Sequence, residues 1–305
     1  MRSYESVWRR STHSSASPAD ALFLMPDRYT YPGTEVLINL PGYTRPEAWK
    51  AAETATVAAH MFELYRDPLP GDFDLDHLRA IHQHLTQDMY SWGGSLRETD
   101  TGPGGTGIAH CRPEFIPAEA ERIFTALSKM DLLSGRDLDS FSAGLAWVWG
   151  ETTVLHPFRD VNTRSQFVFF NQLATHAGWT IDWTSIDPYV FAHARTVAIV
   201  RDETGIEALL HPALIPLDEA TRHDELRDRL ARSRETFFTP RQPRSPTELD
   251  AELDSAMHRR SEHLPQVDSR LAEALEERRS KLPPPESFGL GSGRSNGRQP
   301  PSLGR

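Results

Sequence analysis

Nine residues near the middle of the 305-residue chain, HPFRDVNTR, bring together several groups that could do chemistry, beginning at His156 and ending at Arg164. An imidazole titrates close to neutral pH and can take a proton from a hydroxyl group. A carboxylate such as that of Asp160 is an oxygen ligand for Mg²⁺. An arginine forms charge-assisted hydrogen bonds with phosphate. Together these groups predict group transfer from a nucleoside triphosphate.

Helices are expected on both sides of this stretch. Residues 140–155 are strongly apolar, and residues from about 163 to 177 form a second helical pattern. Pro157 disfavours helical geometry at His156, so the first helix should end there and the imidazole should project from the break. The first turn of the second helix offers unpaired backbone N–H groups and the positive end of its dipole, which predicts an anion site.

Hydrophobic spacing predicts the other helices of a mainly α-helical core. Residues 46–64 and 75–89 have helical periodicity, and Asp74 is the expected N-cap of the second. A further helix begins at Pro117, and residues 187–214 contain one or two more. In the segment that precedes Pro117, glycine and proline are too dense for a helix, which predicts a mobile flap whose flanks pair as a small β-hairpin.

Composition divides the chain into a folded domain and two extensions. The domain is predicted over residues 29–216, after a flexible N-terminal segment over residues 1–28. Residues 217–305 are predicted to be a helical and disordered tail, because they are poor in the apolar residues that offset the entropy of ordering. One isolated, solvated helix is expected over residues 247–282, with a break at Pro265.

Charge and cysteine content exclude several classes of protein. The net charge is −10, and an acidic domain repels a phosphate backbone, so nucleic acid is not an expected partner. No run approaches the roughly 18 apolar residues that cross a bilayer, so no membrane association is expected. The single cysteine, Cys111, excludes an internal disulfide and fits a cytoplasmic protein.

The stretch resembles the motif of the Fic (filamentation induced by cAMP) family, whose usual form is HPFx(D/E)GNGRxxR. The segments YPGTEVLINLPGY, FDLDHLRAIHQHLTQDMYSWGGSLRETD, CRPEFI and NQLATHAGWTIDW also resemble bacterial Fic toxins and follow in the same order. The resemblance covers roughly residues 29–216. It implies a compact Fic-type helical bundle and AMPylation, the transfer of AMP from ATP to a Ser, Thr or Tyr hydroxyl of a target protein, with Mg²⁺ and loss of pyrophosphate.

The resemblance also implies roles for single residues of the motif: general base for His156, Mg²⁺ ligand for Asp160, phosphate contact for Asn162 and phosphate clamp for Arg164. Phe158 would be a packing residue that seats the loop. The flap, residues 96–116, would dock the target segment as an added strand, through main-chain hydrogen bonds that fix its hydroxyl near the imidazole.

The motif departs from the family pattern at three positions. Val161 and Thr163 replace the two glycines that line the phosphate site, and Phe167 replaces the second arginine. Glycine reaches positive φ and lets phosphate approach the backbone, and β-branched valine is poorly suited to both. If the loop keeps its usual path, Val161 either is strained by about 1–3 kcal/mol or intrudes on the anion site. These changes predict transfer slower by about two to four orders of magnitude.

Three functions are therefore open, and AMPylation at a reduced rate is favoured because the acid/base, metal and clamp residues are kept together. A catalytically degenerate Fic-fold module could bind a partner through its flap. A phosphotransferase of the death-on-curing type is disfavoured, because those relatives have a lysine where this chain has Thr163. No good match to the inhibitory pattern [S/T]xxxE[G/N] precedes the motif, which predicts a toxin-type enzyme with a separate small antitoxin.

Overall fold

The computed structural model describes residues 27–104, 106–217, 244–261 and 269–281. Its α-helices are α1 (Pro46–Arg66), α2 (Leu75–Thr86), α3 (Ile116–Lys129), α4 (Leu138–Leu155), α5 (Asn162–His176), α6 (Pro188–Val200), α7 (Thr204–Leu210), α9 (Pro246–Ser261) and α10 (Ser269–Lys281). Short 3₁₀ turns occupy Pro113–Phe115, Asp131–Leu133, Trp183–Ser185 and His211–Ala213. Two strands, β1 (Trp179–Ile181) and β2 (Leu214–Pro216), form one antiparallel sheet. The predicted fold class, mainly α-helical, is confirmed.

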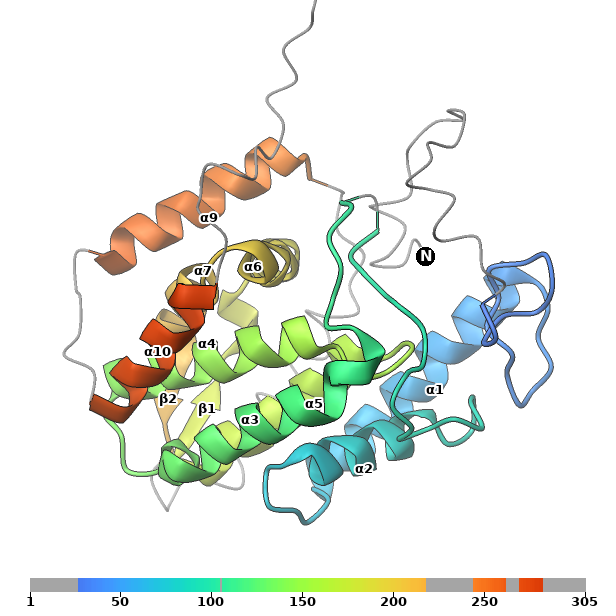
Figure 1. The fold of residues 1–305 in the computed structure, drawn as a ribbon, viewed down its shortest axis with the longest axis horizontal. Helices are drawn as coiled ribbons and strands as arrows, with labels where there is room; N and C mark the ends of the chain where they lie inside the picture. The colour runs from blue at the N-terminus through green and yellow to red at the C-terminus, as the bar shows by residue number, and fades with distance from the viewer. Residues whose placement is uncertain (1–26, 105, 218–243, 262–268, 282–305) are drawn as a thin grey trace, which may run out of the picture.

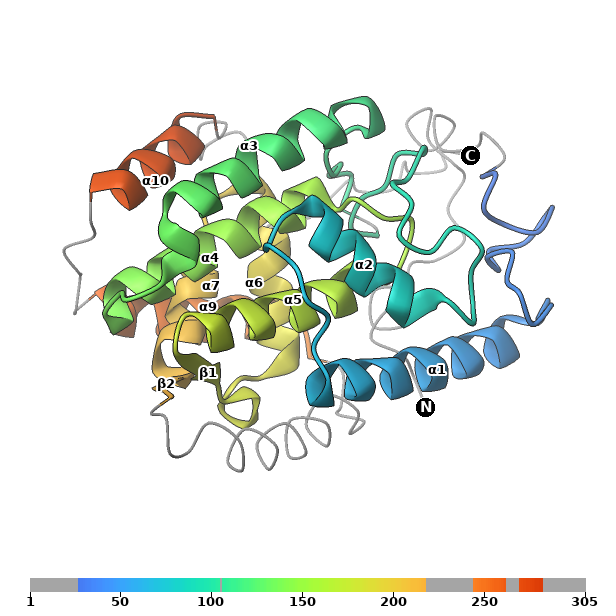
Figure 2. The same ribbon diagram turned by 90° about the horizontal axis from the view of Figure 1, so that it is seen from below.

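Helix α4 is the centre of the bundle, and nearly all of its residues are buried. Helices α3, α5, α6 and α7 pack around it, while α1 and α2 pack against each other and against α5 (Figures 1 and 2). A helix that is apolar all round can only be stable inside such a shell. The two helices on either side of the HPFRDVNTR stretch, α4 and α5, are thus the innermost pair.

Aspartates begin three of the helices. The side chain of Asp74 accepts a hydrogen bond from the His77 N–H at 2.8 Å, which confirms it as the N-cap of α2. Asp137 accepts from the Ser140 N–H at 2.8 Å at the start of α4, and Asp187 caps α6 in the same way. These caps satisfy N–H groups that have no partner within their own helix.

The end of α2 was predicted three residues too late. The helix ends at Thr86, and the N–H groups of both Met89 and Tyr90 turn back to the Thr86 carbonyl, at 2.9 and 2.8 Å. This turn leads the chain out of the helix and into the flap. The hydrophobic spacing continues through Met89, which is buried, so periodicity alone could not locate the end.

The small sheet is present but not where it was expected. Strands β1 and β2 lie after α5, whereas the described residues of the flap contain no strand. The two arms of the flap are joined by the His110 N–H, which donates to the Thr101 carbonyl at 2.9 Å. Pro103, between the arms, has no N–H to donate, and the glycines around it lack the stiffness that a ladder requires, which explains the missing strands.

Helix α9 is packed on the domain, so the expectation of an isolated helix was wrong for this part of the tail. Leu249 and Leu253 belong to the hydrophobic core, and Leu253 lies so close to Gly205 of α7 that a Cβ there would be 3.0 Å from its Cδ1. Arg260 forms an ion pair with Glu207 at 2.8 Å. Leucine and arginine side chains of α9 thus both contribute to docking, and Leu253 and Arg260 both contact α7.

Several expectations concern residues that lie outside the described ranges. They include almost all of the flexible N-terminal segment, the break at Pro265 and the disordered end of the chain. The domain boundaries drawn from composition therefore stay predictions. Within the described residues, every helix is too short or too polar to cross a membrane.

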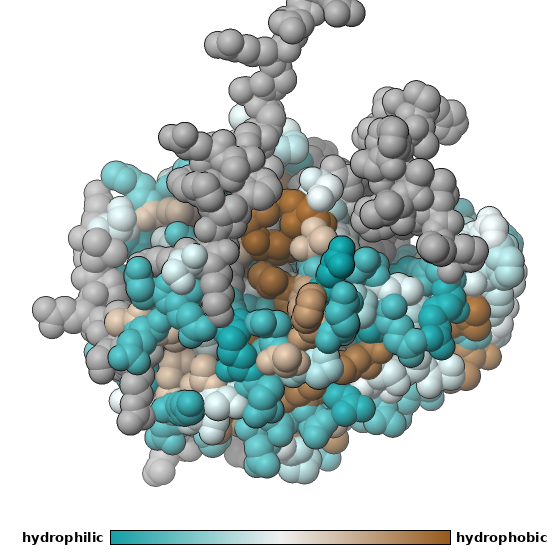
Figure 3. All heavy atoms as spheres, viewed as in Figure 1, coloured by the Kyte–Doolittle hydropathy of each residue, from teal (hydrophilic) through white to brown (hydrophobic). Residues whose placement is uncertain are grey.

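One face of the molecule carries both hydrophilic and apolar surface (Figure 3). In the view of Figure 1, apolar residues gather in a hollow beside α6 and the flap (Figure 3).

Candidate active site

Helix α4 ends at His156, as Pro157 predicted. The backbone of His156 is left-handed, with φ 43° and ψ 60°, while its N–H still bonds the Thr152 carbonyl at 3.0 Å. The imidazole leaves the helix toward the flap and stacks on the ring of His110, with centroids 3.7 Å apart and planes 4° apart. The residue is half-buried, and its Nδ1 atom is shielded from solvent.

Both stacked imidazoles are held in their neutral form. Burial lowers the pKa of His156 well below its ordinary value, and the nearby His110, Arg195 and Arg97 lower it further. Burial also lowers the pKa of His110 to about 3, with smaller effects from the same two arginines. A neutral imidazole can accept a proton, so His156 is in the state that a general base requires at neutral pH.

Arg97 attaches the flap to the end of α4. Its guanidinium is buried, with the residue 2% exposed, and donates from Nε to the His156 carbonyl at 2.8 Å and from Nη2 to the Cys111 carbonyl. The backbone N–H of Arg97 donates to the Pro157 carbonyl at 2.9 Å, and the backbone N–H of Cys111 donates to the Val154 carbonyl at 2.8 Å. Both arms of the flap are therefore fixed beside the imidazole.

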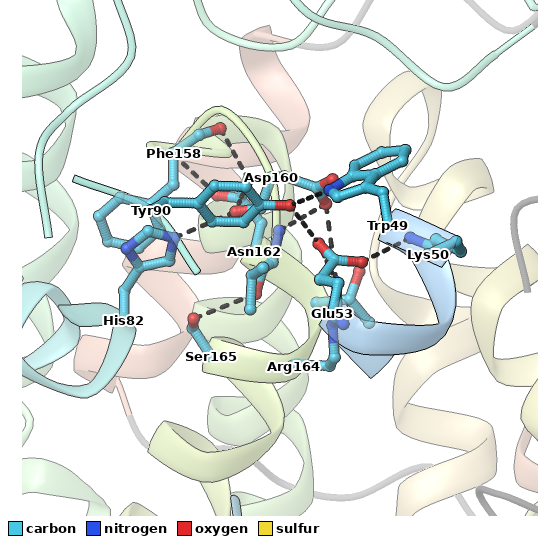
Figure 4. A network of polar contacts seen from close by, with 12 residues as sticks. Trp49, Lys50, Glu53, His82, Tyr90, Phe158, Asp160, Asn162, Arg164 and Ser165 are labelled. Carbon is cyan, nitrogen blue, oxygen red and sulfur yellow. Dashed lines mark hydrogen bonds and ion pairs between the residues drawn. The ribbon is translucent and has the colours of Figure 1, made fainter. Parts of the chain in front are cut away.

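The loop after His156 is braced from inside by Asn162 (Figure 4). The Asn162 amide accepts from the Phe158 N–H at 2.9 Å and donates to the Phe158 carbonyl at 2.7 Å. The Phe158 ring is buried and stacks on His82, at 3.8 Å between centroids. His82 accepts from the Gly94 N–H at Nδ1, which leaves Nε2–H to donate to the Asp160 carbonyl at 3.1 Å. Phe158 thus seats the loop as the motif implied.

Val161 occupies the conformation that a glycine would adopt. Its φ is 60° and its ψ is 6°, in the left-handed region that β-branched residues rarely enter. The side chain is 2% exposed and belongs to the hydrophobic core. Its N–H donates to Asp160 Oδ1 at 2.6 Å. Of the two expectations for Val161, the loop therefore shows backbone strain, with the side chain turned into the core.

Arg164 is tied to a buried carboxylate from another helix (Figure 4). Its Nη2 lies 3.4 Å from Oε1 of Glu53, on α1, and 3.7 Å from Oδ1 of Asp160. Glu53 is fully buried and also receives hydrogen bonds from Lys50 at 2.8 Å and from the Tyr90 hydroxyl at 3.0 Å. Burial raises the pKa of Tyr90, which keeps that hydroxyl a donor. These contacts fix the guanidinium at the amino end of α5.

The positions of the second glycine and the second arginine have different surroundings. The Thr163 hydroxyl accepts a hydrogen bond from Arg195 of α6 at 3.1 Å. Phe167 is 8% exposed and packs edge-on against Trp149 at 5.5 Å and Trp183 at 4.7 Å, with Phe191 nearby. Position 167 therefore belongs to an aromatic cluster inside the bundle.

The predicted site residues all lie on one loop and the first turn of α5: His156, Asp160, Val161, Asn162, Thr163 and Arg164. The first turn leaves backbone N–H groups without intrahelical partners, and no side chain caps it at Val161. Such a turn can bind an anion beside a cationic clamp, a carboxylate that can hold a divalent cation and a neutral base. Sequence reasoning missed Glu53, His82, Arg97, His110 and Arg195, which reach the loop from other elements and give no local spacing signal.

Comparisons with known proteins identify the family of this chain. The sequence profile of the Fic/DOC family matches residues 72–174. The chain is 35% identical over 173 residues to the probable protein adenylyltransferase y4lH of Sinorhizobium fredii, covering 55% of this chain and 85% of that protein. It is 31% identical over 183 residues to the probable protein adenylyltransferase Fic of Escherichia coli, covering 60% and 90%. The chain therefore belongs to the Fic/DOC family.

Solved structures share the fold. The N-terminal Fic domain of a putative cell filamentation protein from Bartonella quintana, which has bound ADP, matches with a TM-score of 0.59 and 24% identity, over 62% of this chain and 95% of that one. The BepC protein from Bartonella tribocorum, which has bound AMPPNP, matches with a TM-score of 0.57 and 24% identity, over 62% and 97%. These likenesses support the helical Fic fold.

Proposed function

We propose that the protein transfers AMP from ATP to a hydroxyl side chain of a target protein. The observation that carries the proposal is the braced loop between α4 and α5, which presents a neutral imidazole, a carboxylate and a fixed arginine at the open amino end of a helix. The curated relatives reported above are named as protein adenylyltransferases, and two solved Fic domains have bound ADP or AMPPNP.

In the proposed reaction, the target hydroxyl oxygen forms a bond to the α-phosphorus of ATP, and the bond from that phosphorus to the β-phosphate oxygen breaks. Pyrophosphate leaves, and the hydroxyl proton passes to His156. Because Nδ1 of His156 is shielded from solvent, Nε2 is the nitrogen that a hydroxyl can approach. The depressed pKa of His156 means that no proton has to be removed first at neutral pH.

The phosphates would bind at the first turn of α5. Its N–H groups and dipole favour an anion, and Arg164 adds a charged donor held in place by Glu53. The amide of Asn162 is bonded to Phe158, so we propose that this side chain shapes the phosphate site and that its backbone N–H is the group available to the nucleotide. Thr163 and the strained Val161 would line the same turn.

Asp160 is the residue that would hold Mg²⁺. A single carboxylate together with phosphate oxygens and water is a common ligand set for this ion, and the Asp160 side chain is partly exposed beside the anion site. The bound ion would offset phosphate charge. Glu53, by contrast, is fully buried and already engaged by Lys50, Tyr90 and Arg164, so it belongs to the framework.

The flap, residues 96–116, is the proposed docking element for the target. Arg97 and Cys111 fix both of its arms to the end of α4, so a peptide added along them would place a hydroxyl near His156. We further propose a toxin-type enzyme of the cytoplasm, where ATP is available, with a small antitoxin protein as partner. The strain at Val161 and the apolar surroundings of Phe167 support a reduced rate.

The test compares ATP labelled at the α-phosphate with ATP labelled at the γ-phosphate, each incubated with Mg²⁺ and a cell lysate, and counts only the label transfer that appears when the protein is added. Label transfer to protein from the α-position alone is the expected result. Transfer from the γ-position would indicate a phosphotransferase of the death-on-curing type. No transfer of either label, with circular dichroism showing the helical fold, would contradict the proposal and favour an interaction module.

A further inference from the structure

A buried arginine on α6 reaches the motif helix from the side. Arg195 is 6% exposed, and its guanidinium donates to the Thr163 hydroxyl at 3.1 Å from Nη1, to Gln166 Oε1 at 2.8 Å from Nη2, and to the Thr153 hydroxyl at 3.3 Å from Nε. An arginine stays protonated even when buried, so this side chain brings a permanent positive charge to α5.

The face of α5 that Arg195 contacts is the face from which an arginine at position 167 would project. Thr163 and Gln166 precede Phe167 by four residues and one residue, and Thr163 lies on the same side of the helix, one turn nearer its amino end. Long side chains in helices point back toward the amino end, over the preceding turn. An arginine at position 167 would therefore extend over Thr163, where Nη1 of Arg195 lies.

Arg195 also has an electrostatic effect at the catalytic loop. Its charge contributes to the lowered pKa of His156, on the loop, and of His110, on the flap, although burial is the larger cause for both groups. The electrostatic field of Arg195 therefore reaches both the catalytic loop and the flap, which face the proposed nucleotide site. Thr163, its partner, is the second residue of α5 and belongs to the turn whose N–H groups point to the anion site.

We infer that Arg195 is a phosphate-binding residue of this protein, which supplies from α6 the charge that the usual motif supplies from position 167. The ligand class is the polyphosphate of a nucleoside triphosphate, and the inference rests on the proposed function. The loss of the second arginine would then be compensated from another helix, while Phe167 completes the aromatic cluster.

Calorimetric titration of ATP with Mg²⁺ tests the inference, with every variant in the His156→Ala background so that the nucleotide is not consumed. Arg195→Gln is expected to weaken ATP binding by about 10- to 100-fold, the usual effect of losing a charge-assisted hydrogen bond. Arg195→Lys should retain part of the affinity, because lysine keeps the positive charge but lacks the planar, bidentate donors of the guanidinium. Binding of adenosine, which has no phosphate, should be the same in all three proteins.

The matched control is Arg260→Gln, which removes an equally buried arginine from α9, where it pairs with Glu207. It should leave ATP affinity unchanged. Equal ATP affinity in the parent protein and Arg195→Gln, or an equal loss for ATP and adenosine, would overturn the inference and leave Arg195 a structural residue. Thermal denaturation of each variant shows whether it is folded.

Failure of the inference can be separated from failure of the proposed function. ATP binding that depends on Arg195, without transfer of α-label by the protein with His156 intact, would keep the inference and refute the reaction. If the Arg195→Gln variant transfers α-label at the full rate, the proposed reaction is kept and the inference about Arg195 is refuted. A parent protein that binds no ATP at all would contradict both.

Discussion

The two sides of the turn between α4 and α5 differ in how closely they follow the family pattern. On the side of His156 and Asp160, the reactive residues are present, and other elements hold the loop by hydrogen bonds from Arg97 and His82. On the side of α5, a valine has the backbone of a glycine, and a phenylalanine packs where an arginine is usual. Val161 thus shows that this loop can keep a left-handed backbone although the residue at that position is not a glycine.

The largest expected effect follows from restoring the missing arginine. Phe167→Arg removes a ring from the cluster of Trp149, Trp183 and Phe191 and adds a buried charge beside that of Arg195, and an uncompensated buried charge costs about 3–5 kcal/mol of the free energy of unfolding. Urea denaturation measures the loss, and Phe167→Leu is the control, with an expected cost below about 1.5 kcal/mol. Equal stability of the arginine variant and the wild type would show that position 167 can face the nucleotide.

The attachment of the flap can be broken at Arg97. Arg97→Met removes charge-assisted hydrogen bonds to partly buried carbonyls of His156 and Cys111, which should cost about 2–3 kcal/mol in the free energy of unfolding. Hydrogen exchange of the Cys111 N–H should also accelerate. Arg112→Met, at an exposed position of the same flap, is the matched control and should change neither quantity. Slow exchange at Cys111 in Arg97→Met would mean that the flap is held by other contacts.

Acid should lower the free energy of unfolding, because it protonates two buried histidines near the catalytic loop. Burial lowers the pKa of both His82 and His110 to about 3, whereas the unfolded chain binds these protons near pH 6.5. The stability that depends on neutral imidazoles is complete above about pH 6.5 and is lost as pH falls toward 3.

Denaturation over this pH range measures the effect. His82→Gln should flatten the dependence, while His258→Gln, at an exposed position on α9, should leave it unchanged. A dependence equally steep in His82→Gln would mean that His82 does not contribute to acid lability.

The smallest expected effect concerns the strained position. Val161→Ala and Val161→Gly both remove the buried methyl groups, but only glycine relieves a φ of 60°. The glycine variant should therefore be more stable than the alanine variant by about 1 kcal/mol, which reverses the usual order within and beside helices. Chemical denaturation of the two variants measures the difference between their free energies of unfolding. Greater stability of the alanine variant would contradict the left-handed backbone at Val161.

Much of the fold could be predicted because its determinants are local. Asp74 caps α2 and Pro157 ends α4, as their neighbours in sequence indicated. The six predicted site residues lie together because they are consecutive, or nearly so, at one helix junction. The supports of the site could not be predicted, because Glu53 and Arg195 reach Arg164 and Thr163 from distant helices. The docking of α9 likewise depends on Leu253 meeting Gly205, a contact that no periodicity encodes.

The central claim is that the imidazole at the end of α4 is the base for transfer of AMP. Transfer of label from α-labelled ATP to lysate protein, compared between the wild type and His156→Ala, tests it most directly. The account predicts that the substitution lowers the rate by about 10²- to 10⁴-fold with the fold and ATP affinity retained. Equal label transfer by the two proteins would contradict it.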